Sequence, residues 1–270
     1  MRYLRMLLCI MALLSVGCST KPRPRLNCIT LMDFSASVPA DSFETYCRVL
    51  NDEVLRHLGR FDRLVVRPID YSSEQRSEVL FEVDLSQQDF SNKRDGYAHK
   101  QEKEKERLEQ FLAEEAKKLI PGIMRVKEER KPLAKYTDII GGLNAAQPDL
   151  SDKAYVKNLI IIFSDMIQES RDVNLTELHL GNIRWESDIL KQIDDKKRIP
   201  NLKGAVIFVF GAGETPEISG DYYRAVRGFW SKFFQKASAN FNEADYGYRN
   251  QDRLHTLLDS LHRSSVPPGR

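Results

Sequence analysis

The chain has 270 residues, of which 41% are hydrophobic and 30% are charged, so it can build a core of ordinary globular size. Its 41 basic and 39 acidic residues give a formal net charge of +2, without the basic excess or stripe that nucleic-acid binding needs. This composition excludes nucleic acid as an expected partner and leaves room for one large or two small domains.

Residues 1–17 are typical of an export signal. Arg2 and Arg5 precede an apolar core over residues 6–14, which is too short for a transmembrane helix. The end of this segment, LSVGC, resembles a bacterial lipobox, and the resemblance implies that Cys18 is lipidated and becomes the first residue of the mature chain. Residues 18–25, with two prolines and several basic residues, are predicted to be an extended tether.

Strands and helices are predicted to alternate along the mature chain. Short apolar, β-branched runs indicate strands over 27–34, 64–69, 78–85, 158–163 and 205–210. Apolar stripes at helical spacing indicate helices over 39–58, 137–146, 187–197, 222–237 and 253–262. This order predicts an α/β fold with a doubly wound, mostly parallel sheet flanked by helices. The run over 78–85, which follows its predecessor closely, is the expected antiparallel edge strand.

Residues 91–130 hold the excess of charge and are predicted to be a long helical insertion. Residues 93–107 are almost wholly polar, with Lys/Glu pairs at helical spacing. An apolar stripe then follows, formed by Leu108, Phe111, Leu112, Leu119 and Ile123. We expect a helix whose first half is solvated and whose second half packs on the domain, in preference to a projecting arm that binds a partner.

Two cysteines, Cys28 and Cys47, remain once the leader and Cys18 are set aside. An exported protein meets an oxidising compartment in which a disulfide is permitted. Cys28 lies in the first predicted strand and Cys47 on the apolar face of the next helix, so two small buried apolar side chains explain them equally well. The sequence leaves both alternatives open.

Oxygen-bearing side chains stand at the end of two predicted strands and before one helix. Asp33, Ser35 and Ser37 follow the first strand, Thr137 lies in the loop before a helix, and Asp165 follows the strand over 158–163. The carboxyl ends of parallel strands meet at one edge of an open α/β sheet, where ligands bind. Hydroxyl and carboxylate oxygens are hard ligands that suit Mg2+ or Mn2+ better than Zn2+.

This combination resembles the von Willebrand factor A (vWA) family from residue 26 to about residue 237. That family's metal-ion-dependent adhesion site (MIDAS) combines an Asp-x-Ser-x-Ser motif after the first strand, a later Thr and an Asp after the fourth strand. The matching segments are DFSAS, the TDIxxGL pattern of residues 137–143 and IIIFSDM. Two features depart from the pattern. Met166 stands where the family often has glycine, and the 100 positions between Ser37 and Thr137 are more than the family usually needs.

The resemblance implies a vWA-like domain over residues 26–240. The residues that follow, 241–270, are predicted to form a C-terminal helix and a disordered tail. The resemblance also implies bound Mg2+ or Mn2+, with the ligands Asp33, Ser35, Ser37, Thr137 and Asp165. In this family a carboxylate from a partner protein typically fills the open coordination position. The implied function is therefore a lipid-anchored, non-catalytic module of the bacterial cell envelope that binds a protein partner through an acidic side chain. Ser19, in place of an aspartate, favours the periplasmic face of the outer membrane.

Two other functions stay open at this stage. A metal-dependent hydrolase would use the same acidic strand end, but no Ser-His-Asp or Cys-His pattern or Walker loop is recognisable, and all five histidines lie outside the three ligand segments. A periplasmic small-molecule-binding lipoprotein would share the anchor and the α/β architecture. It would need a cleft between two lobes, and the pattern predicts one lobe.

Overall fold

The computed structural model describes residues 25–71, 73, 78–91, 99–130, 136–153, 156–171, 173–176, 184–213 and 220–263. The predicted export signal, the lipidation site Cys18 and the tether up to residue 24 lie outside the described residues. The tail after residue 263 lies outside them as well. Within the described part of the chain, no helix has the length and apolar character needed to cross a membrane.

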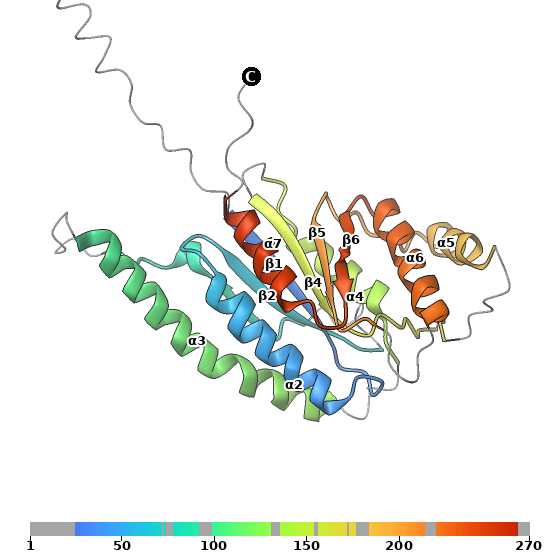
Figure 1. Ribbon diagram of the computed structural model, residues 1–270, viewed down its shortest axis with the longest axis horizontal. Helices are drawn as coiled ribbons and strands as arrows, with labels where there is room; N and C mark the ends of the chain where they lie inside the picture. The colour runs from blue at the N-terminus through green and yellow to red at the C-terminus, as the bar shows by residue number, and fades with distance from the viewer. Residues whose placement is uncertain are drawn as a thin grey trace, which may run out of the picture.

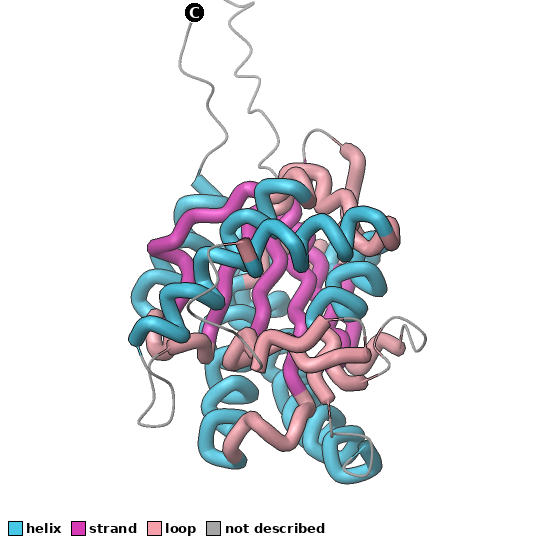
Figure 2. Tube along the Cα trace, turned by 90° about the vertical axis from the view of Figure 1, so that its right-hand side faces the viewer, coloured by secondary structure: helices cyan, strands magenta, loops and turns pink. Residues whose placement is uncertain are grey.

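A six-stranded sheet in the order β3-β2-β1-β4-β5-β6 forms the centre of the molecule (Figures 1 and 2). Neighbouring strands are parallel except for β2 and β3, which are antiparallel. The strands are β1 (Arg25–Asp33), β2 (Arg63–Ile69), β3 (Phe81–Asp84), β4 (Val156–Phe163), β5 (Val206–Phe210) and β6 (Asn240–Gly247). The predicted mostly parallel sheet with an antiparallel edge strand is confirmed. Chain order reverses between β1 and β4, which makes the gap beyond their carboxyl ends the switch point of the sheet.

The sequence predicted no strand where β6 lies. Half of its residues are exposed and only Asp245 and Tyr246 are buried, because β6 is an edge strand that pairs with β5 alone. An edge strand with one neighbour needs few apolar residues, so its sequence carries little strand signal. After β6 the chain continues into a C-terminal helix over residues 251–263.

Helices cover both faces of the sheet (Figure 1). On one face lie α2 (Ala40–Val49), which short π- and 3-10-helical turns continue to His57, α3 (Lys100–Arg130) and α7 (Gln251–Arg263). On the other lie α4 (Ile139–Ala146), α5 (Trp185–Asp195) and α6 (Gly220–Lys236). Each face buries its own apolar cluster. The apolar stripe predicted over residues 222–237 lies on α6 and is part of the second cluster, with Phe229, Trp230, Phe233 and Phe234 fully buried.

The long insertion forms the helix that the sequence predicted. The first twelve residues of α3 include no buried one, and the buried residues that follow are Leu112, Leu119, Ile123 and Arg130. Pairs in the first half, such as Lys105 with Glu109, remain exposed. The helix runs beside α2, against which its second half packs (Figure 1). Most of α3 is therefore part of the domain, although its first turns extend beyond the apolar contacts.

The thiols of Cys28 and Cys47 are free and buried in this structure. Burial raises the pKa of Cys28 and of Cys47 to about 12, which keeps both as neutral thiols at physiological pH. Of the two alternatives that the sequence left open, the structure has the small buried apolar side chains.

Candidate metal centre

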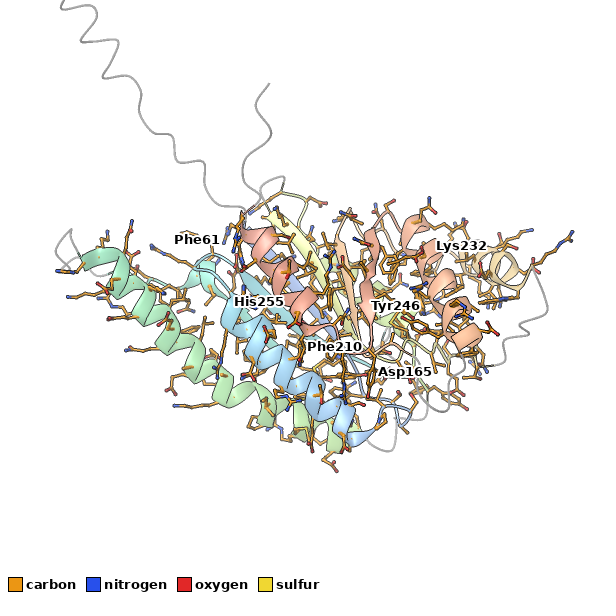
Figure 3. The ribbon with its side chains drawn as sticks, in the orientation of Figure 1. Phe61, Asp165, Phe210, Lys232, Tyr246 and His255 are labelled. Atoms are coloured by element: carbon orange, nitrogen blue, oxygen red, sulfur yellow. The ribbon has the colours of Figure 1, made fainter. Side chains whose placement is uncertain are left out.

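The loops that follow β1 and β4 emerge side by side. These strands pair in parallel along their length, with Met32 opposite Phe163 at the carboxyl end. Asp33 is the last residue of β1, and Asp165 lies two residues beyond β4. Figure 3 labels Asp165 at the end of the sheet where these loops gather, on the opposite side of the molecule from Phe61. The sheet thus places two predicted ligands at its switch point.

The DFSAS turn gathers one carboxylate and two hydroxyls. Asp33 Oδ1 accepts a hydrogen bond from the backbone N–H of Ser35 (2.9 Å). The hydroxyl oxygens of Ser35 and Ser37 lie 2.9 Å apart. Asp33 and Ser35 are buried, whereas Ser37 is exposed, so the group is open to solvent on the Ser37 side.

Asp165 belongs to the same group of side chains. Its Oδ1 accepts a hydrogen bond from the backbone N–H of Ile167 (2.9 Å), and the Ser37 hydroxyl also bonds to its carboxylate. Ser37 therefore links the loop after β1 to the loop after β4.

Thr137 joins this region through its backbone. Its N–H donates to the carbonyl oxygen of Glu169, and its carbonyl accepts from the N–H of Glu169, both at 2.9 Å. The next residue, Asp138, caps α4 by accepting from the N–H of Gly141 (3.0 Å) and also from the side chain of Gln168 (3.1 Å). The buried Thr137 is thus held against the loop that follows Asp165, although no hydrogen bond among the described residues joins its side chain to the other four predicted ligands.

The two carboxylates of this group disfavour each other's charge. Burial raises the pKa of Asp33, and hydrogen bonds from Ser164 and Ser35 oppose this only in part. Burial and then the nearby charge of Asp33 raise the pKa of Asp165 to about 7. The ammonium of Lys127, which lies 3.4 Å from the centroid of the Phe43 ring, is the cation that favours ionised Asp33. Two carboxylates with two hydroxyls in this setting form a donor set that fits Mg2+ or Mn2+, because a divalent cation removes the cost of ionising both acids.

This raised pKa predicts a pH dependence of stability in the presence of EDTA. The folded chain holds the proton of Asp165 more tightly than the unfolded chain, so the stabilisation is present below about pH 4 and is lost as the pH rises through about 7. We expect the wild type to lose free energy of unfolding relative to Asp165→Asn between pH 4.5 and 8. Denaturant unfolding of both proteins across that range measures the difference. A difference that is independent of pH would contradict the raised pKa.

Two residues that the sequence did not assign to the site support it. The hydroxyl of Ser164 donates to Asp33 Oδ2 (2.6 Å) and accepts from the N–H of Met166 (3.0 Å). Gln168 connects the Asp165 loop to Asp138. Ser164 stands directly before a predicted ligand, which is a weak signal, and nothing in the sequence pattern marks Gln168.

The surroundings of Met166 account for the departure from glycine at this position. Its φ of 65° lies in the left-handed region that favours glycine. Its side chain is fully buried, and its carbonyl accepts a hydrogen bond from Trp230 Nε1 (2.8 Å). The apolar contacts and this bond offset the backbone strain, which is on the order of 1–2 kcal/mol.

No protein-family model and no curated protein matches the chain. Three solved structures share part of its architecture at low similarity. Proximal thread matrix protein 1 (PTMP1) from the mussel byssus has a TM-score of 0.39 and 10% identity over 88% of this chain and 45% of its own. Manganese-loaded TRAP protein of Plasmodium vivax has a TM-score of 0.38 and 13% identity over 88% of this chain and 73% of its own. The pilus adhesin SpaC of Lactobacillus rhamnosus GG has a TM-score of 0.38 and 11% identity over 90% of this chain and 30% of its own.

The chain spans less than half the length of PTMP1 and of SpaC. Similarity of this degree carries no inference about function. The chain's own sheet and side chains define its class, a mixed α/β protein with a doubly wound, mostly parallel sheet.

Proposed function

We propose that this chain is a vWA-like, non-catalytic binding module that recognises a protein partner through a divalent cation. The ligands of the Mg2+ or Mn2+ are Asp33, Ser35, Ser37, Thr137 and Asp165. The observation that carries the proposal is the gathering of two carboxylates and two hydroxyls at the switch point, with the pKa of both acids raised. A divalent cation would balance the charge of both acids when they ionise.

The donor set also indicates the chemistry of the partner. Three of the five ligands are neutral hydroxyls, so they leave the positive charge of the ion incompletely neutralised. Hard cations prefer anionic oxygens, and the exposed Ser37 marks the side from which such an oxygen reaches the ion. The partner therefore contributes a carboxylate from Asp or Glu, which the positive charge attracts and orients.

The position of the site fits a lipid anchor at Cys18. The chain enters the sheet at Arg25, the first residue of β1, and the proposed cation lies beyond Asp33 at the other end of that strand. Nine residues of strand separate the two ends by roughly 26 Å. A module anchored at the periplasmic face of the outer membrane would then present the cation away from the bilayer.

Capture of partners in the presence and absence of metal tests this function. The full chain, in mild detergent, would be immobilised and exposed to an envelope fraction with Mg2+ or with EDTA, beside Asp33→Ala. Each captured protein would then be purified and titrated. The proposal predicts a partner that binds the wild type in Mg2+ only and that weakens at least tenfold when one of its own acidic residues is neutralised. Binding that is equally tight in EDTA and to Asp33→Ala would contradict it.

A further inference from the structure

Three of the chain's five histidines lie together on the face of the sheet that α2 and α7 cover, and His262 lies nearest the amino end of β1. His57 ends the 3-10 turn (Leu55–His57) that follows α2, and His255 and His262 lie on α7. Asp62 connects His262 to the start of β1. Its Oδ1 accepts from the N–H of Leu26 at the start of β1 (2.8 Å), and its Oδ2 lies 2.8 Å from His262 Nε2.

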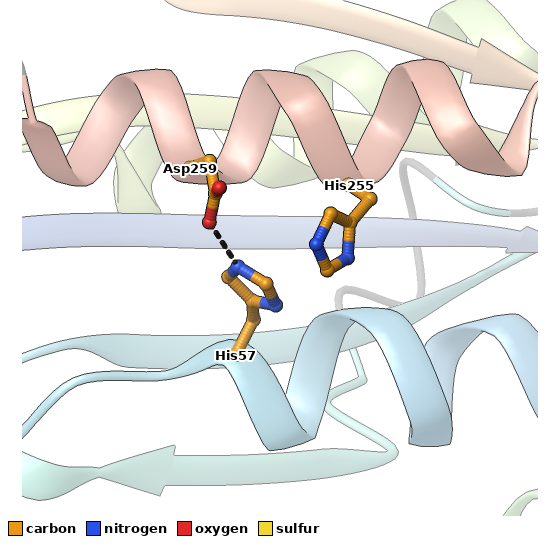
Figure 4. Close-up of side chains that lie close together, drawn as sticks. All are labelled: His57, His255 and Asp259. Carbon is orange, nitrogen blue, oxygen red and sulfur yellow. Dashed lines mark hydrogen bonds and ion pairs between the residues drawn. The ribbon is translucent and has the colours of Figure 1, made fainter.

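A carboxylate completes this group of side chains. One ring nitrogen each of His57 and His255 and one carboxylate oxygen of Asp259 all lie within 4.8 Å of one another (Figure 4). The closest pair is His57 Nε2 and Asp259 Oδ1, at 2.9 Å. Two imidazole nitrogens are borderline-soft donors, and together with one carboxylate they suit Zn2+ better than the all-oxygen set at the carboxyl ends of the strands does.

We propose that His57, His255 and Asp259 bind a Zn2+ ion. Tetrahedral zinc with ligands at 2.0–2.2 Å places its donor atoms roughly 3.4 Å apart. The distance of 2.9 Å between His57 Nε2 and Asp259 Oδ1 must therefore lengthen slightly. The longest distance between two of the three donor atoms, at most 4.8 Å, must shorten by about 1.4 Å. All three side chains are at least partly exposed, so rotation about their χ angles makes this adjustment without a backbone shift.

The backbone supplies the ligands at suitable spacing. His255 and Asp259 are four residues apart on α7 and therefore lie on the same face of the helix. His57 reaches them from a segment about 200 residues earlier. Its ring meets that of His255 edge to face, with centroids 4.7 Å apart and planes at 82°, so the two rings do not stack and their nitrogens can converge (Figure 4).

Neighbouring residues orient these ligands. Glu53 Oε2 lies 3.2 Å from His255 Nδ1, which leaves Nε2 of that ring for the ion. Metal-binding histidines commonly donate their second N–H to a carboxylate in this way. Arg263 donates to Asp259 Oδ2 (2.7 Å), which leaves Oδ1 for the ion.

A zinc ion here would cross-link α7 to the segment that follows α2. The helix otherwise packs on the sheet through its three buried leucines, Leu254, Leu258 and Leu261. His262, one turn beyond Asp259 on α7, connects this helix through Asp62 to Leu26 at the start of β1. This inference does not depend on the proposed function, because it involves neither the same ion nor the same residues.

Zinc titration of the full chain tests the site. The protein would be made without a polyhistidine tag, stripped of metal, saturated with Mg2+ and titrated with ZnCl2. Co2+ would serve as a spectroscopic probe of tetrahedral coordination. We expect one Zn2+ per chain, with affinity at least about 100-fold weaker in His57→Ala/His255→Ala and about tenfold weaker in Glu53→Gln.

Three control variants distinguish zinc binding at this site from zinc binding elsewhere on the chain. His255→Ala alone removes a largely exposed side chain, so its fold is expected to be intact while its zinc affinity falls. His99→Ala changes an exposed histidine before α3, and Asp33→Ala changes the other proposed cation site. Both should bind Zn2+ like the wild type. Equal zinc affinity in the wild type and His255→Ala, or a folded wild type that binds no Zn2+ at micromolar concentration, would overturn the proposal.

Discussion

Replacement of Arg130 by methionine is expected to lower the free energy of unfolding by about 3–5 kcal/mol. Arg130, at the end of α3, is buried and forms ion pairs with the fully buried Asp70 and with Glu78. The pair with Asp70 dominates, because Glu78 is half exposed and solvent screens its charge. Loss of the guanidinium removes this ion pair from the fully buried Asp70 carboxylate. Denaturant unfolding measures the loss.

Arg125→Met provides the matched control on the same helix. Arg125 is exposed and lies 3.8 Å from Glu129, so we expect a change below about 1 kcal/mol. A small effect at both positions would contradict the buried ion pair. Arg130 also acts on the candidate site, because the carbonyl of Asp70 accepts from the N–H of Asp138 (3.2 Å), next to Thr137. We therefore expect Arg130→Met to weaken cation binding as well.

Gly211→Ala is expected to cost about 3 kcal/mol or more and to disturb the candidate metal centre. Gly211 follows β5 with a φ of 109°, which L-residues rarely adopt. A Cβ atom there would overlap the Tyr46 hydroxyl and lie 2.9 Å from the Ser164 carbonyl oxygen. Backbone strain of about 1–2 kcal/mol and overpacking of about 1–3 kcal/mol therefore add. Because Ser164 holds Asp33, the displacement should also reduce Mg2+ affinity.

Gly204→Ala is the control that has backbone strain at a positive φ but no steric overlap of the added Cβ atom. Gly204 has a φ of 70°, but no atom lies within 4 Å of the position that its Cβ would take. We expect a loss of about 1–2 kcal/mol from strain alone and unchanged Mg2+ affinity. Thermal unfolding and Mg2+ titration of both variants provide the comparison, and equal effects at the two glycines would contradict the packing of Gly211 against Tyr46 and Ser164.

The sequence predicted helices and strands best where their burial produces a regular pattern of apolar residues along the chain. β1, β4 and β5 are covered on both faces, so they read as continuous apolar runs, and α6 shows a clear aromatic stripe. β6 was missed because an edge strand with few buried residues has no such pattern. The convergence of Asp33 and Asp165 was predictable because parallel neighbours end at the same edge of a sheet.

The rest of the site depends on contacts between loops, which sequence spacing does not encode. The bonds of Ser164 to Asp33 and of Gln168 to Asp138 join segments 131 and 30 residues apart. The contact between His57 and Asp259 joins the segment that follows α2 to α7, and the two residues are 202 positions apart in the sequence. None of these contacts follows from periodicity or from a local motif. They become visible only when the tertiary structure places the segments together.

Thermal unfolding of the full chain in EDTA and then in millimolar Mg2+ or Mn2+ tests the central claim most directly. The wild type would be compared with Ser35→Ala/Ser37→Ala, which removes two proposed ligands and leaves both carboxylates. A cation that binds only the folded chain, at about one hundred times its dissociation constant, adds roughly 2.7 kcal/mol. We predict this stabilisation in the wild type and its loss in the double variant. No stabilisation of the wild type, or an equal rise in both proteins, would contradict a cation bound at the carboxyl ends of β1 and β4.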